Sequence, residues 1–309
     1  MILRGAVQTI FGILTFIPGV YQWRARKLGS GGSYSSLYCY SVYLRHMVKA
    51  NESGLNIKPN TVAELGPGDS LGIGLMALLL GSEKYYAFDV VKFSDLSKNL
   101  VILDDLIILL KKRESIPDDV QYPRVCPKLN NYSFPEEIYS DDYLEYCLSD
   151  ERIKRIRDSL SGGSMIEYKA PWFNKEAVQE NTVDMIISQA VLEHIDELDL
   201  TYRQLYQWLK RDGFMTHCID FKSHGYAKTW DGHWKISSWR WFLLRGNRTY
   251  FINREPYSTH TTLLEKYKFR IMKEVIVKKE PSFQNNITSK SDAVISGAFI
   301  QVKKQPEVC

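Results

Sequence analysis

The chain has 309 residues, of which 44% are hydrophobic and 25% are charged. These fractions are typical of a globular protein and exclude a disordered chain, a collagen and a polytopic membrane protein. The length favours one α/β core with insertions over two separate domains. The net charge of +4 is small, and no run of five or more basic residues occurs, so nucleic-acid binding is not expected.

The cysteines are five in number and widely spaced, and none of them forms a C-x-x-C pair. This pattern indicates a reducing compartment and no structural zinc site. We therefore expect a cytoplasmic location.

The N-terminal segment, residues 1–28, contains a largely apolar stretch from Gly5 to Trp23 that is followed by Arg24, Arg26 and Lys27. A secretory signal is disfavoured because the charge lies on the wrong side and no small-residue cleavage site is present. A spanning helix is disfavoured because polar residues and Pro18 interrupt the stretch. We expect a helix in the membrane interface whose basic end, up to residue 27, contacts anionic lipid at the inner face of the cytoplasmic membrane. The alternative is a helix packed on the protein's own core or in a dimer.

Downstream of a Gly/Ser-rich stretch at 29–36, the hydrophobic pattern alternates between strand and helix periods. It predicts helices at 37–49, 71–80, 94–113, 198–210 and 259–267, and strands at 61–65, 85–89, 164–168, 183–188, 214–221, 269–277 and 293–302. Gly213 is expected to end the fourth of these helices. The β-α-β-α order predicts a mostly parallel sheet with right-handed crossovers, and the last two strands are expected to pair antiparallel.

Two excursions interrupt this alternation and are expected to be insertions within a domain that spans residues 29–309. The first, at about 114–161, is rich in Pro and Tyr and contains a charged helix at 151–158. The second, at about 222–257, is rich in aromatic residues. We expect the two insertions to form a lid over the substrate.

A glycine-rich turn, V-A-E-L-G-P-G-D-S-L-G-I-G at 62–74, joins the first of these strands to the next helix. Such a turn allows a ligand to approach the backbone closely and points the helix N-terminus at it, as in sites for NAD, FAD, nucleotide sugars and S-adenosylmethionine. Glu64 favours a cationic ligand group over a pyrophosphate. The carboxylate of Asp89, about twenty residues further on, could accept hydrogen bonds from both hydroxyls of a ribose. The alternatives are a carboxylate that caps backbone groups for Glu64 and a helix N-cap for Asp89.

Four stretches in order resemble the successive motifs of class I S-adenosylmethionine-dependent methyltransferases. They are E-L-G-P-G-D-S, Y-A-F-D-V-V, V-D-M-I-I-S-Q-A-V-L-E-H-I and L-K-R-D-G-F-M, all within residues 61–221. The resemblance implies a Rossmann-like fold with a seven-stranded, mostly parallel sheet, helices on both faces and an antiparallel C-terminal strand. It also implies S-adenosylmethionine as the cofactor.

The resemblance carries over to individual residues that would bind parts of the cofactor. These are Glu64, Gly66, Pro67 and Gly68 for the methionine and ribose, Asp89 and Val90 for the ribose, Glu167 and Tyr168 for the adenine, and Ser188 and Gln189 for the sulfonium end. The stretch I-E-Y-K at 166–169 departs from the family's acidic-then-small pattern.

Methyl transfer to a hydroxyl requires alignment and a base for the proton, and histidine is the commonest base near neutral pH. We expect Asp220 and His224, just past the end of a strand, to form the base system. His194 and His217 are alternative bases, and His233 in W-D-G-H-W would contact substrate or only pack. For each of them a purely structural role is the other interpretation.

A metal centre is the remaining alternative, because Glu193 and His194 with a later histidine resemble ligands in some methyltransferases that act on a ribose hydroxyl. Those enzymes carry another carboxylate three residues before the glutamate. Here Ala190 occupies that position, so no metal is predicted.

The acceptor is indicated by residues 224–258, where Trp and Tyr alternate with Arg, Asn and Asp. Aromatic faces with a polar rim suit a sugar ring, although the same residues could simply pack a lid onto the sheet. This stretch resembles methyltransferases of bacterial polysaccharide biosynthesis. We expect O-methylation of a saccharide or a lipid-linked glycan; the alternatives are a small hydrophobic or phenolic acceptor, and a cofactor-binding protein without turnover.

Overall fold

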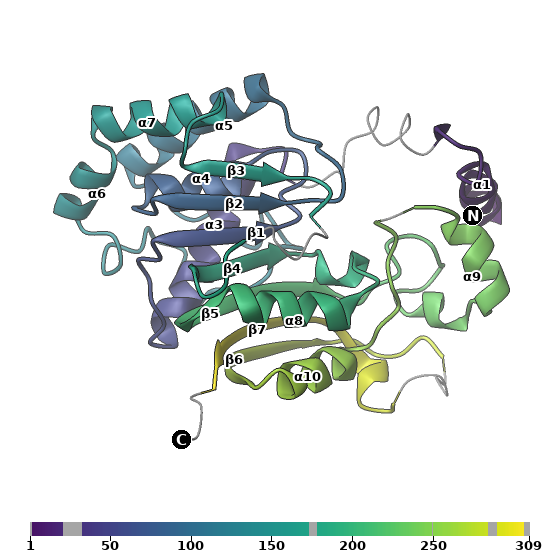
Figure 1. The fold of residues 1–309 in the computed structure, drawn as a ribbon. Coiled ribbons are helices and arrows are strands. Elements are labelled where there is room, and N and C mark those ends of the chain that lie inside the picture. The colour runs from purple at the N-terminus through teal and green to yellow at the C-terminus, as the bar shows by residue number, and fades with distance from the viewer. Residues whose placement is uncertain (1, 21–32, 173–177, 249, 284–288, 306–309) are drawn as a thin grey trace.

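The computed structural model describes residues 2–20, 33–172, 178–248, 250–283 and 289–305. At its centre lies a seven-stranded sheet of order β3-β2-β1-β4-β5-β7-β6 (Figure 1). The strands are β1 (Thr61–Leu65), β2 (Lys84–Phe88), β3 (Ile166–Lys169), β4 (Val183–Gln189), β5 (Leu209–Asp220), β6 (Phe269–Lys278) and β7 (Ile295–Lys304). The first five pair in parallel, whereas β7 pairs antiparallel with both β5 and β6. The Rossmann-like fold predicted from the sequence is confirmed.

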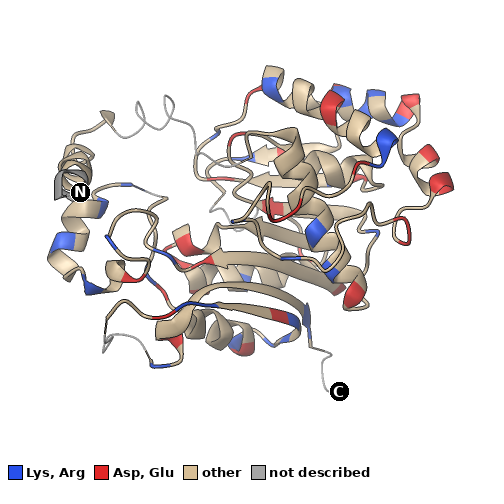
Figure 2. Cartoon of the chain, turned by 180° about the vertical axis from the view of Figure 1, so that it is seen from behind, with Lys and Arg blue, Asp and Glu red and all other residues tan. Residues whose placement is uncertain are grey.

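Helices cover both faces of this sheet. The α-helices are α1 (Ile2–Leu14), α3 (Ser36–Glu52), α4 (Gly72–Leu79), α5 (Leu96–Lys112), α6 (Asp141–Cys147), α7 (Asp150–Leu160), α8 (Leu198–Trp208), α9 (Ser238–Arg245) and α10 (Tyr257–Lys266), and short 3-10 helices are η2 (Leu192–His194), η3 (Gly232–Lys235) and η4 (Asp292–Val294). Helices α3, α4, α5 and α7 pack on one face, and α8 and α10 on the other. Charged residues lie mainly on helices and loops (Figure 2). Strand β1 is buried along its whole length, as expected for a central parallel strand, and this includes its two polar residues Thr61 and Glu64.

Local capping interactions set where several predicted helices begin. Helix α5 begins at Leu96 rather than Ser94, because the Asp95 side chain accepts a hydrogen bond from the backbone N–H of Lys98 at 2.9 Å. Helix α10 begins at Tyr257, directly after the N-cap Pro256. The charged stretch at 151–158 lies in α7, and α6 and α9 are helices that the sequence analysis did not predict.

The expected role of Gly213 is wrong. Helix α8 ends at Trp208 and β5 begins at once at Leu209, so Gly213 lies inside the strand. The pairing of β4 with β5 shifts register between Val183 and Met185, opposite Leu209 and Phe214. A glycine fits this irregularity because a Cβ there would lie 3.0 Å from the Asp184 carbonyl oxygen.

The N-terminal helix α1 packs against α9, to one side of the sheet (Figure 1). Gly12 makes this packing close, since a Cβ at that position would lie 2.1 Å from the Leu243 carbonyl oxygen. The Thr15 hydroxyl accepts a hydrogen bond from the Asn247 backbone N–H at 2.8 Å. Within the described ranges, no helix has the length and apolar character that crossing a membrane would require. Residues 21–27 of the predicted basic end lie outside those ranges.

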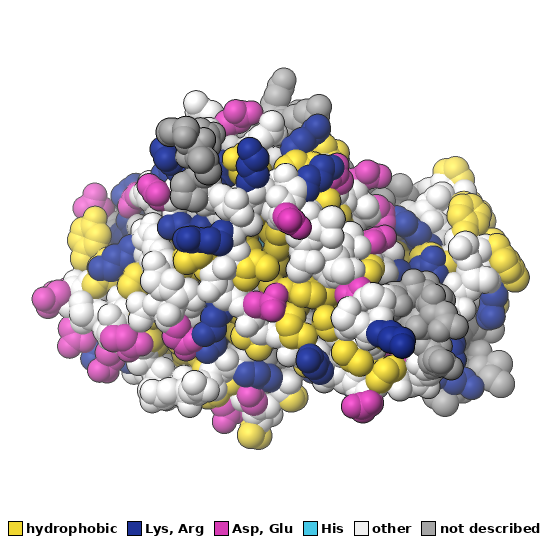
Figure 3. Space-filling model, turned by 90° about the horizontal axis from the view of Figure 1, so that it is seen from below, with side chains coloured by type: hydrophobic (Ala, Val, Ile, Leu, Met, Phe, Trp, Pro, Cys, Tyr) yellow, Lys and Arg dark blue, Asp and Glu magenta, His cyan; other side chains and the backbone are white. Residues whose placement is uncertain are grey.

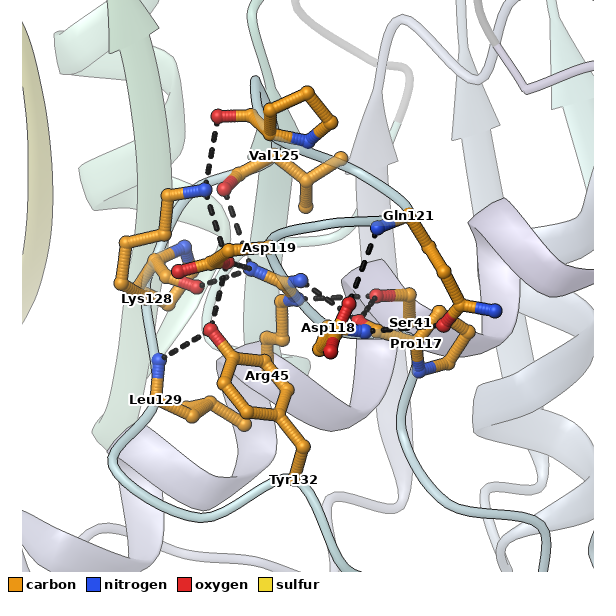
Figure 4. Close-up of polar contacts among 12 residues, drawn as sticks. Ser41, Arg45, Pro117, Asp118, Asp119, Gln121, Val125, Lys128, Leu129 and Tyr132 are labelled. Carbon is orange, nitrogen blue, oxygen red and sulfur yellow. Dashed lines mark hydrogen bonds and ion pairs between the residues drawn. The ribbon is translucent and has the colours of Figure 1, made fainter.

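A buried arginine joins α3 to the segment that follows α5 (Figure 4). The Arg45 side chain is fully buried. Its guanidinium donates to the Pro117 carbonyl at 2.7 Å and to the Asp119 carboxylate at 3.0 Å. It also donates to the carbonyls of Val125 and Pro127 at 3.3 and 3.1 Å. One cation therefore satisfies several carbonyl groups of a segment without regular structure.

We expect Arg45→Met to lower the free energy of unfolding by about 2–4 kcal/mol, because the carbonyls that it satisfies would remain buried without donors. Urea denaturation followed by circular dichroism measures the change. Lys128→Met is the matched control, since Lys128 also pairs with Asp119 but its side chain is 44% exposed, and its loss should cost below about 1 kcal/mol. Equal losses in the two variants would show that the arginine network does not hold this segment.

Candidate active site

A pocket lies at the carboxyl ends of the parallel strands, where open α/β sheets bind ligands. It is lined by residues from the turns after β1, β2 and β4 together with aromatic side chains from more distant segments: Leu65, Gly66, Gly68, Phe88, Asp89, Val90, Phe93, Trp172, Gln189, Ala190, Val191, His194, Ile195 and Tyr250. The sequence-predicted residues Gly66, Gly68, Asp89, Val90, Gln189 and His194 thus meet in one place.

The turn after β1 depends on Gly66. Its φ is 63°, a conformation that favours glycine. A Cβ at Gly66 would lie 2.6 Å from a methyl carbon of Val191, so a larger residue would clash with the turn after β4. The Gly66 backbone N–H donates to the Phe88 carbonyl at 2.8 Å. The turns after three neighbouring strands are therefore held together around this glycine.

Asp89 is almost fully buried at the edge of this pocket. Its carboxylate accepts hydrogen bonds from the backbone N–H of Gly68 at 3.2 Å and of Val90 at 2.7 Å. Burial raises the pKa of Asp89 to about 6, although these hydrogen bonds lower it. A carboxylate in this position can accept further hydrogen bonds from ligand hydroxyls, which fits the predicted ribose contact.

Neighbouring residues of β4 point to opposite faces of the sheet. Gln189 lines the pocket, and its side-chain oxygen hydrogen-bonds His46 of α3 at 3.0 Å. Ser188 is fully buried and hydrogen-bonds Nδ1 of His217 at 2.7 Å. Of this predicted pair, Gln189 lines the pocket, whereas Ser188 does not.

Four other predicted cofactor residues lie near the pocket without lining it. Glu64 accepts a hydrogen bond from the Tyr85 hydroxyl at 2.6 Å, and burial raises its pKa to about 8. The Pro67 carbonyl accepts a hydrogen bond from Ser33. Glu167 forms ion pairs with lysines of β2 and β3, and the Tyr168 hydroxyl accepts from the Phe93 backbone. The structure therefore gives Glu64 and Glu167 partners within the protein.

A polar group lies at one end of the pocket, where η2 meets the end of β5. It consists of Glu193, His194, Asp220 and His224 and is termed the rim group. The rings of His194 and His224 are 5.1 Å apart between centroids. Nε2 of His224 lies 3.7 Å from Oδ2 of Asp220 and 3.9 Å from Oε1 of Glu193. The predicted pair Asp220 and His224 is thus brought together with His194.

Burial alters the ionisation of this group. It lowers the pKa of His194 to about 4 and also lowers the pKa of His224. It raises the pKa of Glu193 well above the ordinary range, and the nearby Asp220 adds to that increase. Neutral imidazoles beside carboxylates can bind a hydroxyl, accept its proton or bind a cation.

Two further candidate histidines lie apart from the rim group. His217 is fully buried inside β5, and burial lowers its pKa to about 3. His233 is buried against Trp234, with ring centroids 4.6 Å apart. In these positions both histidines contribute to packing.

The sequence analysis missed several residues that shape the site. Val191 limits the size of residue 66, and Phe93, Trp172 and Tyr250 line the pocket. Asn253 holds η2 in place, since its side-chain amide donates to the carbonyls of Leu192 and Ile195 at 2.9 and 2.7 Å. The motif Q-A-V-L-E-H contains Val191, but no local pattern shows which distant residues pack against it.

Comparison with known proteins matches part of this chain to a family. Residues 132–216 match the family model described as a methyltransferase domain. The matched stretch contains β3, β4, η2 and α8 and ends within β5, and it does not include the glycine turn or Asp89. A search of curated proteins found no match.

Solved structures with a similar arrangement include two S-adenosylmethionine-dependent methyltransferases. The one from Methanosarcina mazei is 13% identical with a TM-score of 0.42, and the match covers 81% of this chain and 94% of that one. The one from Mesorhizobium loti is 12% identical with a TM-score of 0.40, covering 79% and 90%. The family match and the Rossmann-like sheet agree with the resemblance to S-adenosylmethionine-dependent methyltransferases noted in the sequence.

We expect Asp89→Asn to weaken S-adenosylmethionine binding by about 1–3 kcal/mol, because charge-assisted hydrogen bonds to the ribose would be lost. In the wild type, affinity should fall as the pH drops through about 6, where the buried carboxylate takes up a proton, and the variant should lose this dependence. Isothermal titration calorimetry between pH 5 and 8 measures both effects.

Glu167→Gln is the control for this experiment. Since Glu167 is engaged by Lys84 and Lys169, its substitution should leave cofactor affinity unchanged. A loss at Glu167 with none at Asp89 would mean that the cofactor binds over β3 instead.

Proposed function

We propose that this protein transfers a methyl group from S-adenosylmethionine to a hydroxyl of a saccharide or lipid-linked glycan. The observation that carries the proposal is the rim group, which adjoins the pocket through His194. Hydroxyl acceptors need a polar group that orients them and takes their proton. The rim group supplies two carboxylates and two imidazoles for that purpose.

The residues of the pocket would divide this work by position. Bound S-adenosylmethionine supplies an activated methyl group on its sulfonium. Asp89 and the glycine turn would bind its ribose and methionine, and Gln189, oriented by His46, would lie towards the rim group. His224 would help to orient the acceptor hydroxyl, and Asp220 would receive its proton. The apolar walls formed by Phe93, Trp172 and Tyr250 would exclude water.

The composition of the aromatic segment at 222–257 suggests stacking against a sugar, but most of its tryptophans pack within the protein instead. Trp230, Trp234 and Trp241 are buried. The ring nitrogens of Trp230 and Trp234 donate to the carbonyls of Glu280 and Arg254. These side chains hold the lid together, so a saccharide would be bound by the rim group and the pocket mouth instead of by stacked tryptophans.

The outer surface of α1 and α9 favours a lipid-linked acceptor. It exposes large hydrophobic residues of both helices and of the turn after α1, among them Ile10, Ile17, Trp239 and Phe242, which are 56%, 53%, 66% and 60% exposed. Hydrophobic side chains are visible at this end of the molecule in Figure 3. Arg240 of α9 is exposed beside them. Apolar side chains with a neighbouring cation suit an anionic membrane surface, and we propose peripheral attachment there.

The acceptor class can be tested with S-adenosylmethionine carrying a labelled methyl group. We expect label in polyprenyl-linked saccharides or free oligosaccharides, with a mass gain of one methyl group at oxygen. Catechol and quinol acceptors test the phenolic alternative in parallel. Label only in the phenols would contradict the saccharide proposal, and no label in any acceptor would favour a cofactor-binding protein without turnover.

We expect His224→Ala to lower kcat on the order of 10²–10⁴-fold, while cofactor affinity stays nearly unchanged, because His224 would act on the acceptor. His217→Asn should retain turnover, since His217 lies inside β5 and away from the rim group. Steady-state kinetics at saturating cofactor compare the two. If His217→Asn loses activity and His224→Ala keeps it, the acceptor does not bind at the rim group.

We expect the double variant Ile10→Ser/Trp239→Ser to lose most of its binding to vesicles containing anionic lipid, because burial of apolar side chains drives interfacial binding. Vesicle co-sedimentation measures the loss. Val120→Ser is the matched control, since Val120 is 87% exposed but lies in the segment after α5. Equal sedimentation of all three proteins would show that this surface does not bind membranes.

A further inference from the structure

We propose that Glu193, His194 and His224 bind a divalent transition-metal ion next to the cofactor pocket. This inference rests on the proposed function in one respect, since the acceptor's oxygens would complete the coordination. It is otherwise independent, because an ion can bind without cofactor or acceptor. One carboxylate oxygen and one imidazole nitrogen from each histidine all lie within 4.8 Å of one another.

The first argument is the state of the Glu193 carboxylate. Glu193 is 3% exposed. Its Oε1 accepts a hydrogen bond from the Asp220 backbone N–H at 3.2 Å, whereas Oε2 is buried and has no hydrogen-bond partner among the described residues. A buried carboxylate oxygen without a donor is costly. A bound cation would supply the missing partner.

The second argument is the tautomer of His194. Its Nδ1 lies 2.8 Å from the Tyr250 carbonyl oxygen. A carbonyl can only accept, so Nδ1 carries the proton and Nε2 of the neutral ring presents a lone pair. Histidines that bind metals are oriented in this way by a backbone carbonyl on the opposite nitrogen.

The third argument is the backbone of the turn after β5. His224 has a φ of 47°, which is uncommon for a residue other than glycine. This conformation places its ring against His194, and Nε2 lies 3.9 Å from Oε1 of Glu193. Strained residues of this kind persist where the surrounding structure fixes them, often at functional sites.

The donor types select the class of ion. Two imidazoles and one carboxylate suit Mn²⁺, Fe²⁺, Co²⁺ or Zn²⁺, whereas Mg²⁺ and Ca²⁺ prefer oxygen ligands alone. Three protein ligands leave coordination positions open. Neighbouring hydroxyls of a saccharide could fill these positions, which would select acceptors with adjacent oxygens.

Asp220 then has a role distinct from that of the ligands. The sequence disfavours a metal because Ala190 replaces a carboxylate, but the fold brings Asp220 from the end of β5 to within 3.7 Å of Nε2 of His224. During transfer, the acceptor O–H bond would break and its proton would pass to the Asp220 carboxylate. The oxygen would form a bond to the methyl carbon while the carbon–sulfur bond breaks and its electron pair stays on sulfur.

The test uses the full chain, freed of metal by a chelator and then titrated with MnCl₂. Calorimetry and the electron paramagnetic resonance signal of free Mn²⁺ measure binding without any turnover. We expect one site in the wild type, with affinity reduced on the order of 100-fold in Glu193→Gln and in His224→Ala, because each removes a ligand. Mn²⁺ should also raise the melting temperature of the wild type and not that of the variants.

Two variants serve as controls. His233→Gln removes a nearby histidine that is outside the ligand set and should keep full Mn²⁺ affinity. Asp220→Asn should keep Mn²⁺ affinity within a few-fold while kcat falls, which separates a base from a ligand.

Binding of S-adenosylhomocysteine to each variant reports whether the protein is folded. If the wild type binds S-adenosylhomocysteine but no Mn²⁺, or if all variants bind Mn²⁺ equally, the metal inference is wrong and the proposed function stands. If Mn²⁺ binds as expected but neither the cofactor nor a product is detected, the proposed function fails and the metal site stands.

Discussion

The site depends on the close approach of the turn after β1 to the turn after β4. Gly66 makes this approach possible, since any Cβ there would overlap the side chain of Val191. The same glycine binds the end of β2 through its backbone N–H. Once these strand ends are joined, Asp89 lies over the glycine turn, and Gln189 and His194 lie on the opposite wall. One packing constraint therefore places Asp89, Gln189 and His194 around the same pocket.

The rim group includes a buried carboxyl group, that of Glu193, beside partly exposed ionisable side chains, and an unpaired charge is costly where water is excluded. The segment that contains Tyr250 and Asn253 contributes hydrogen bonds around them. Asn253 donates to the carbonyls of Leu192, the first residue of η2, and of Ile195, which follows it, and the Tyr250 carbonyl orients His194. Stability alone would favour apolar residues here, and the ligand that we propose would give Glu193 Oε2 the partner that it lacks among the described residues.

Features that depend on local sequence were predictable. The strand β1 has the predicted bounds Thr61–Leu65. The glycine turn and Asp89 were predicted from their spacing in the sequence, and the structure brings Gly68 of that turn into hydrogen-bond contact with Asp89. What could not be predicted depends on tertiary contacts. Glu64 and Ser188 lie in correctly predicted strands, yet their side chains have protein partners outside the pocket. The segment at 222–257 has the aromatic composition of a sugar-binding surface, but most of its tryptophans are buried by packing.

The central claim is that S-adenosylmethionine binds over the glycine turn and against the turn after β4. Hydrogen–deuterium exchange with and without S-adenosylhomocysteine tests it most directly, because it maps binding along the whole chain. The account predicts slower exchange at residues 65–70, 88–91 and 188–195. Unchanged exchange in these segments, or protection confined to the separate pocket beside Leu37 and Asp118, would contradict it.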